Sequence, residues 1–262
     1  MFTINPFSEL TGFISPIAMQ VYVITMVILV VGGTLLDTVH KKSAKYFFLN
    51  AEKAKAAATK SLSGGEKASI AFKTVAEDVL TSGEFCNPRR RVAHLLTMYG
   101  FILFAATTAI MIFGYTDSAT PAILPLLWHA GALMLCVGGY WFWFFIRVDV
   151  AAEGNPWYRV VRADLFILSL LATATFGLIW SALQAAGAAG WSTLFFGLFI
   201  FASTVLFGGV LWSKFAHMFF KPAAAYQKRV AEADGSRDGL PAPADQPEQF
   251  GPGIKRLLPK NY

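Results

Sequence analysis

Five long apolar stretches constrain the fold of this chain more than any other feature. Each holds at least the roughly 20 residues that a helix needs to cross a bilayer. They cover residues 16–39, 92–115, 121–146, 163–184 and 191–220. A segment in hydrocarbon must satisfy its own backbone hydrogen bonds, which an α-helix does. We therefore expect an all-α integral membrane protein with five transmembrane helices.

The composition agrees with this expectation and excludes several classes of protein. Hydrophobic residues make up 55% of the chain, and its mean hydropathy of +0.51 is too high for a soluble domain. The net charge of +6 comes from loops and the tail, without interleaved aromatics, so nucleic acid is not the expected partner. The two cysteines, Cys86 and Cys136, are too few for an iron–sulfur cluster or a tetrahedral zinc site. A redox centre in this chain must therefore use histidine.

Basic residues at the ends of the stretches predict the topology. Lys41 and Lys42 follow the first stretch, and Arg89–Arg91 precede the second. Because Lys and Arg favour the cytoplasmic side, we expect the N-terminus outside and the C-terminus in the cytoplasm. The first stretch lacks a basic region before it and a small-residue cleavage site, so we expect no removable signal peptide.

Four histidines are the candidate site residues. His40 ends the first stretch, His94 begins the second and His217 lies near the end of the fifth. His129 lies seventeen residues from Ile146, or roughly 25 Å at 1.5 Å per residue, which is too far to share an iron with the others. A bis-histidine haem would thus draw its ligands from His40, His94 and His217.

We favour His94 with His217, because each lies in an apolar frame about one turn from basic residues, whereas His40 abuts two lysines. The alternative is that all three are unrelated interfacial histidines. For His129 the alternatives are a hydrogen bond to a neighbouring helix, a ligand of a second haem, or a proton-linked contact to a quinone. The pairs Gly138–Gly139 and Gly208–Gly209 either pack helices closely or leave room for a flat ring.

The chain divides into four parts. They are 1–40, the N-terminus and first span; 41–92, a cytoplasmic helical segment; 93–221, a four-span haem-binding bundle; and 222–262, a partly disordered cytoplasmic tail. In the second part we expect helices over 43–60 and 66–80, separated by a break at 63–65. The apolar stripe of the later helix indicates either contact with the membrane or a neighbour, or a docking surface for a soluble partner.

Two histidine-containing segments carry a resemblance to a known family. Residues 90–94 followed by 99–101, together with 213–217, resemble the haem-b membrane subunits related to the gamma subunit of respiratory nitrate reductase. Within that superfamily the chain is most similar to the membrane subunit of the quinone-interacting complex that serves adenylylsulfate reductase. It is also similar to the membrane anchor found with that enzyme in sulfur oxidisers. The missing N-terminal cysteine domain favours the anchor, and the similarity covers about 16–221.

The resemblance implies that His94 and His217 are axial ligands of a haem b near the cytoplasm. The nitrate reductase subunit carries a second histidine pair on spans two and five, whereas those spans hold no further histidine here. The implied function is an electron-transfer subunit of a respiratory chain in the bacterial cytoplasmic membrane. It would connect a cytoplasmic iron–sulfur flavoenzyme, adenylylsulfate reductase, to membrane quinone.

The main rival is a cofactor-free membrane anchor for a cytoplasmic enzyme. A transporter is less favoured, since the spans show no obvious internal repeat.

Overall fold

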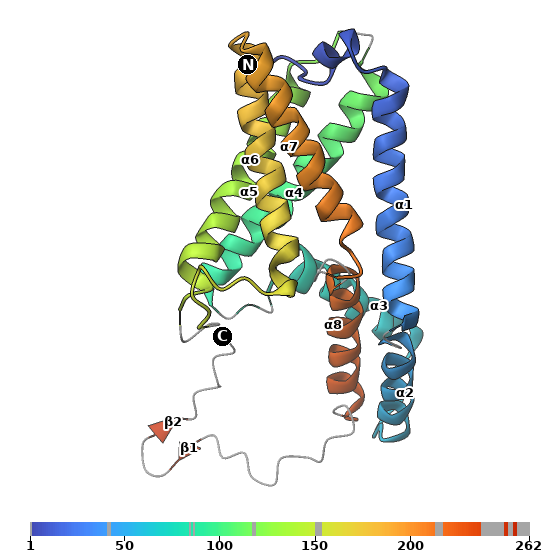
Figure 1. Cartoon of the computed structure of the whole chain (residues 1–262). Coiled ribbons are helices and arrows are strands. Elements are labelled where there is room, and N and C mark those ends of the chain that lie inside the picture. The colour runs from blue at the N-terminus through green and yellow to red at the C-terminus, as the bar shows by residue number, and fades with distance from the viewer. Residues whose placement is uncertain are drawn as a thin grey trace. The chain divides into compact units, whose positions relative to one another are not determined.

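The computed structural model describes residues 2–40, 43–83, 85, 87–116, 119–149, 154–212, 217–236, 249–250 and 254–255 (Figure 1). Five of its helices are long and apolar enough to cross a membrane, which confirms the expected all-helical membrane architecture. They are α1 (Pro16–His40), α4 (Pro88–Gly114), α5 (Ile123–Trp141) continued by the π-helix η3 (Phe142–Ile146), α6 (Leu165–Ala185) preceded by the short 3-10 helix η4 (Arg162–Asp164), and α7 (Ala189–Gly208).

The remaining elements are short or amphipathic. They are the 3-10 helix η1 (Ser8–Gly12), α2 (Ser43–Ala56), α3 (Gly64–Lys73), the π-helix η2 (Thr74–Leu80), α8 (His217–Asp234), and two antiparallel strands of two residues each, β1 (Gln249–Phe250) and β2 (Ile254–Lys255). The chain forms two compact units. The first, the membrane unit, comprises Met1–Asp37 and Val92–Ala216, and the second, the helical unit, comprises Thr38–Arg91 and His217–Tyr262.

Small residues bring α4 and α5 into close contact in the membrane unit. A Cβ placed on Gly100 would lie 2.8 Å from the carbonyl oxygen of Gly131, and one on Gly138 would lie 2.7 Å from that of Ala93. The buried face of α4 repeats every three or four residues, as a packed helix face must. Its members are Ala93, Gly100, Phe104, Thr107 and Met111. Helices in lipid associate through such close backbone approach because no hydrophobic effect drives them together.

The helix α1 joins this bundle through polar and small side chains. The Tyr22 hydroxyl lies 2.7 Å from Ser203 Oγ on α7, and Gln20 donates to the carbonyl of Ile112 on α4 at 3.3 Å. A Cβ on Gly33 would lie 3.0 Å from that of Val210, just beyond α7. These contacts hold α1 to the membrane unit although most of its large side chains are exposed.

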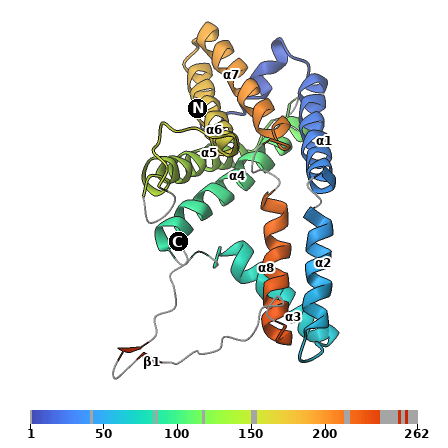
Figure 2. The ribbon, with the colours of Figure 1, turned by 60° about the horizontal axis from the view of Figure 1, so that its bottom comes forward.

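The helical unit brings together segments that are far apart in the sequence. The helix α8 contacts α2, α3 and η2 (Figure 2). The backbone N–H groups of Thr59 and Lys60 donate to the carbonyl of Asp234, at 3.0 and 3.2 Å, at the C-terminal end of α8. Gly235 follows with a φ of 77°, a left-handed conformation that suits glycine at the end of a helix. The segment before α3 thereby closes the end of α8.

Several helix boundaries differ from the sequence-based expectations, and α2 for example ends at Ala56 rather than at residue 60. The second spanning helix begins at Pro88 rather than Val92, because Asn87 Oδ1 accepts from the Arg89 N–H at 2.9 Å and proline suits the first helical position. The fifth expected span, 191–220, is too long, since α7 ends at Gly208. His217 is instead the first residue of α8. Consecutive glycines at 208–209 favour this helix end.

Candidate functional site

The four histidines divide equally between the two units. His94 on α4 and His129 on α5 belong to the membrane unit, while His40 and His217 belong to the helical unit. His40 is exposed at the end of α1. The backbone of His217 begins α8, but its side chain and residues 213–216 lie outside the described part of the chain. The pairing of His94 with His217 therefore stays a prediction.

His94 stands beside the packed face of α4 rather than within it. Its neighbour Ala93 is buried against Gly138 of α5, whereas the His94 side chain is exposed. His94 follows Pro88 by six residues, which is about 9 Å of helix, and it lies beyond the arginines of the first turn. His94 therefore lies near one end of the membrane unit, on a helix that is predominantly apolar beyond it.

His129 is a buried bridge between α5 and α6. Its side chain is 1% exposed, Nδ1 lies 2.7 Å from the carbonyl oxygen of Pro125, and Nε2 lies 2.8 Å from Ser181 Oγ. The rings of Phe2 and Trp128 meet it edge-on, with centroids 5.0 and 4.9 Å away. Of the three expectations for His129, the hydrogen bond to a neighbouring helix is the one that the structure shows.

These bonds define how the imidazole is protonated. The Pro125 carbonyl can only accept, so Nδ1 carries the hydrogen and donates. In the neutral ring Nε2 then accepts from the Ser181 hydroxyl. A metal bound at Nε2 would need the lone pair that receives this hydrogen bond. Both ring nitrogens of His129 therefore have hydrogen-bond partners within the protein in this structure.

The register of α4 against α5 keeps His94 and His129 apart. Gly100 meets Gly131, and Ala93 meets Gly138, so the two helices run antiparallel with His94 near the level of Gly138. His129 precedes Gly138 by nine residues in α5, which is roughly 13 Å of helix. Two nitrogens that bind one iron each approach it to about 2 Å. The two histidines of the membrane unit therefore cannot ligate the same metal in this arrangement.

The pair Gly138–Gly139 packs helices closely, whereas Gly208 and Gly209 lie at the end of α7. At Gly138 the space is filled by Ala93 and Thr97 of α4, and a Cβ on Gly139 would lie 2.6 Å from Leu171 of α6. A Cβ on Gly209 would lie 2.4 Å from the carbonyl oxygen of Val205. Of these four glycines, only Gly208 could carry a Cβ with no neighbouring atom closer than 3.9 Å. Among the described residues, no group of three or more His, Cys, Asp or Glu side chains is arranged to hold a metal ion.

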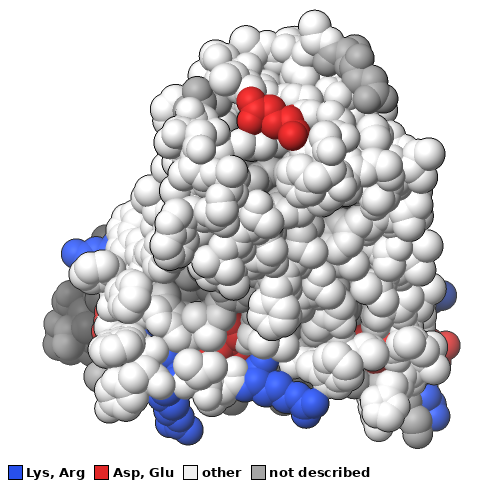
Figure 3. All heavy atoms as spheres, turned by 45° about the horizontal axis from the view of Figure 1, so that its top comes forward, with Lys and Arg blue, Asp and Glu red and all other residues white. Residues whose placement is uncertain are grey.

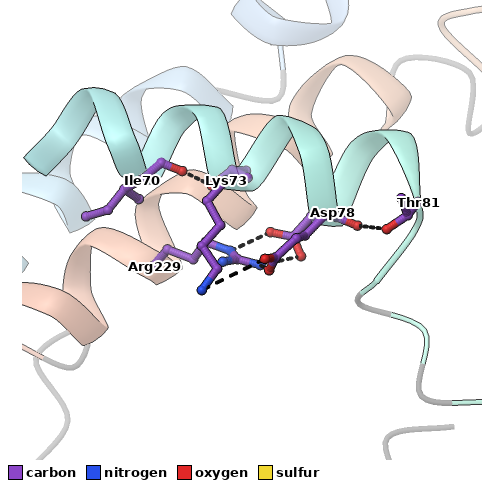
Figure 4. A network of polar contacts seen from close by, with 7 residues as sticks. Ile70, Lys73, Asp78, Thr81 and Arg229 are labelled. Atoms are coloured by element: carbon purple, nitrogen blue, oxygen red, sulfur yellow. Dashed lines mark hydrogen bonds and ion pairs between the residues drawn. The ribbon is translucent and has the colours of Figure 1, made fainter.

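Arg229 in α8 forms a polar clamp that sequence reasoning missed (Figure 4). Its guanidinium donates to Asp78 at 2.6 and 2.9 Å and to Glu77 at 2.8 Å, both on η2. The hydrogen bonds to Asp78 and then to Glu77 raise the pKa of Arg229 above its usual range. Lys73 adds a longer ion pair to Glu77 at 3.9 Å. The residues lie about 150 positions apart in sequence, so no local pattern could reveal the pairing.

A second arginine, Arg147, is almost fully buried beyond η3. Its guanidinium lies 4.2 Å from the centroid of the Trp143 ring and is paired with Asp164. In the sequence, Arg147 directly follows the third apolar stretch, 121–146. A basic residue followed by an acidic one seventeen positions later is too weak a signal to predict this pair.

Comparisons with known proteins return no match to a protein-family model, to a curated protein or to a solved structure.

Proposed function

We propose that this chain is a haem-b membrane subunit that passes electrons between a cytoplasmic iron–sulfur flavoenzyme, adenylylsulfate reductase, and the quinone of a bacterial cytoplasmic membrane. The observation that carries the proposal is the placement of His94, an exposed imidazole about 9 Å into an apolar helix that begins with three arginines. His94 would supply one axial nitrogen and His217 the other. A bound haem would carry single electrons, while this chain would hold and orient it.

The distribution of charge supports the proposed orientation. All 22 Lys and Arg residues lie in the segments 41–91, 147–162 and 214–260, which share one side of the membrane if the five apolar helices all cross it. The segments on the other side of the membrane contain no Lys or Arg. Figure 3 shows a face of the molecule on which uncharged residues form a broad expanse. The positive-inside rule then places the N-terminus outside and the C-terminus in the cytoplasm.

Residues 41–92 and the C-terminal tail are the proposed docking surface for the soluble enzyme. Residues 41–91 hold 11 Lys and Arg against 5 Asp and Glu, so an acidic partner surface suits them. Exposed apolar side chains accompany this charge, among them Tyr46, Phe48 and Phe72. Direct contact between enzyme and membrane subunit is what electron transfer between them requires.

The second candidate is a cofactor-free membrane anchor for the same class of enzyme. It is favoured by His129, whose two ring nitrogens are both engaged in hydrogen bonds within the protein. In that case His94, His40 and His217 would be interfacial residues without a metal.

A pyridine haemochrome spectrum of the purified full chain separates the two candidates. We expect haem b in the wild type, loss of the low-spin bis-imidazole spectrum in His94→Ala and His217→Ala, and its retention in His40→Ala. A wild-type protein expressed with ample haem and purified without it would favour the anchor. Loss of the spectrum in His40→Ala but not in His217→Ala would reassign the second ligand to His40.

Deletion of residues 237–262 tests the docking role of the tail. This deletion keeps Asp234, whose carbonyl accepts from Thr59 and Lys60 in the helical unit. We expect weaker co-purification of the enzyme, with weaker dependence on salt because charge contacts are removed, and an unchanged haem spectrum. Full retention of the enzyme with the same salt dependence would restrict docking to the helical unit.

A further inference from the structure

One face of α5 carries an exposed apolar stripe along its whole length. The exposed members are spaced by seven, four, three and four residues, which places them on one side of the helix and its π-helical extension. They are Leu126, Leu133, Val137, Tyr140 and Phe144. Since α5 is one of the five apolar helices, this stripe is the part of it that meets lipid acyl chains.

The stripe continues beyond the helix onto the following loop. The rings of Tyr140 and Phe144 are stacked with centroids 6.1 Å apart, and Phe144 meets Trp157 at 6.3 Å. Trp157 in turn meets Tyr158 edge-on at 5.8 Å. Trp157 is 58% exposed and Tyr158 is 72% exposed. The aromatic rings thus pass without a break from the lipid-facing side of α5 to loop 154–161.

Arg147 holds the backbone of this loop in place. Its guanidinium donates to the carbonyl of Pro156 at 2.9 Å and to that of Arg159 at 2.7 Å, and it is paired with Asp164. Asp164 also accepts from the N–H of Val161 at 2.9 Å. A buried charge is tolerated only when it is paired and hydrogen-bonded, and here the loop itself supplies the partners. The loop is therefore wrapped around the Arg147 side chain, which is 1% exposed.

We propose that loop 154–161 is an anchor for the lipid headgroup layer, positioned by Arg147. Trp157 and Tyr158 are the amphipathic aromatic residues that favour this layer. Arg159 and Arg162 are exposed on the same connection and reach lipid phosphates, most strongly in an anionic leaflet. The partner is the bilayer surface rather than a protein, because the aromatic contacts continue a face that already meets lipid. This assignment does not depend on a haem.

The test measures the membrane depth of a nitroxide label in the full chain, reconstituted into nanodiscs with and without anionic lipid. The label is attached to Trp157→Cys, in a background in which Cys86 and Cys136 are serine. Val137→Cys provides a lipid-facing control, and Ser61→Cys provides an exposed polar control from the helical unit. We expect the oxygen-to-nickel accessibility ratio at position 157 to lie between the two controls and to rise with anionic lipid. A ratio equal to that of Ser61→Cys would overturn the proposal and point to a soluble partner.

A second comparison tests the role of Arg147. Arg147→Lys keeps the charge but loses the planar fork that reaches two carbonyls and a carboxylate. We expect the label at position 157 to become several-fold more accessible to nickel, while the label at Val137 is unchanged and the helix content is retained. Arg89→Lys is the matched control, because Arg89 is an exposed arginine of α4 that lies outside the loop. An unchanged depth at position 157 in folded Arg147→Lys would exclude Arg147 as the positioning residue.

Discussion

Nε2 of His129 on α5 lies 2.8 Å from Oγ of Ser181 on α6, and this is a hydrogen bond between two buried side chains in a membrane unit. The opposite ring nitrogen donates to the Pro125 carbonyl one turn earlier in α5. The imidazole is thus held on both sides, and the ring of Trp128 meets it edge-on. A histidine in hydrocarbon is unusual, and here two hydrogen bonds satisfy its polar atoms.

The first prediction concerns the stability of this bridge. Ser181→Ala leaves Nε2 of His129 without a donor, while Nδ1 keeps its bond. Interhelical hydrogen bonds in membranes contribute about 0.6 to 2 kcal/mol, so we expect a loss of this size in the free energy of unfolding. Unfolding in mixed micelles of increasing denaturing detergent would measure it. Thr193→Ala is the control, because its hydroxyl is exposed and bonds only within α7; equal losses in both variants would contradict the bridge.

The second prediction concerns the contribution of His129 to electron transfer. Both ring nitrogens of His129 form hydrogen bonds within the protein. We therefore expect His129→Ala to retain the haem proposed at His94 and His217. A slower reoxidation of the reduced protein by a quinone analogue, measured by stopped flow, would show that His129 also assists quinone. A rate equal to that of Ser181→Ala, with all haem retained, would mean that His129 acts through packing alone. Loss of part of the haem would instead identify a second haem.

The number of spanning helices could be predicted because a bilayer imposes both a length and a composition on each one. The ends of the helices were harder to predict. The helix α7 stops at Gly208 although apolar residues continue to Phe220, so hydropathy alone overestimates its length. Residues typical of helix ends predict the boundaries better than hydropathy does. Asn87 before Pro88 marks the start of α4, and Gly235 marks the end of α8.

The break expected at 63–65 lies earlier in the chain, between the end of α2 at Ala56 and the start of α3 at Gly64. Ser63 caps α3, and the two glycines lie within its first turn. Serine followed three residues later by Glu66 is the pattern of a capping box, which is visible in the sequence. The Arg147 and Arg229 contacts carry no such signal. Their partners are backbone carbonyls and distant carboxylates that only the folded chain brings together.

The third prediction tests the close crossing of α4 and α5. Gly100→Ala would place a Cβ 2.8 Å from the carbonyl oxygen of Gly131 and from the N of Leu135, which are backbone atoms that cannot turn aside. Overpacking of this kind costs about 1 to 3 kcal/mol, so we expect a lower thermal midpoint in detergent. Gly197→Ala on α7 is the control, because a Cβ there meets no atom within 4 Å. A midpoint as high in Gly100→Ala as in Gly197→Ala would contradict the crossing.

The fourth prediction concerns the pH dependence of α3. Hydrogen bonds from the backbone and then the side chain of Ser63 lower the pKa of Glu66 below its usual value of 4.5. A depressed pKa in the folded state adds stability that is present above pH 4.5 and is lost as the pH falls through the folded value. We expect the protection of the first α3 amides from hydrogen exchange, corrected for intrinsic rates, to fall below pH 4.5. Glu66→Gln should remove this dependence, and a dependence that persists would assign it to another carboxylate.

The fifth prediction concerns the clamp between α8 and η2. Arg229 binds both oxygens of Asp78 and one of Glu77, a geometry that only the planar guanidinium provides. We therefore expect Arg229→Lys as well as Arg229→Ala to increase hydrogen exchange in α8 and η2 together, by several-fold, because each helix shields the other. The adjacent variant Lys228→Ala should leave both segments unchanged, since Lys228 is exposed.

Asp78→Asn is the complementary variant, because it removes the charge that Arg229 pairs with and keeps the shape of the side chain. If the clamp joins the two segments, this variant should loosen α8 although the change lies on η2. Charge pairs at the surface weaken with salt, but the Asp78 side chain is only 14% exposed, so the wild-type protection should persist at high ionic strength. Protection of α8 that responds to Arg229 variants but not to Asp78→Asn would mean that Glu77 is the partner that matters.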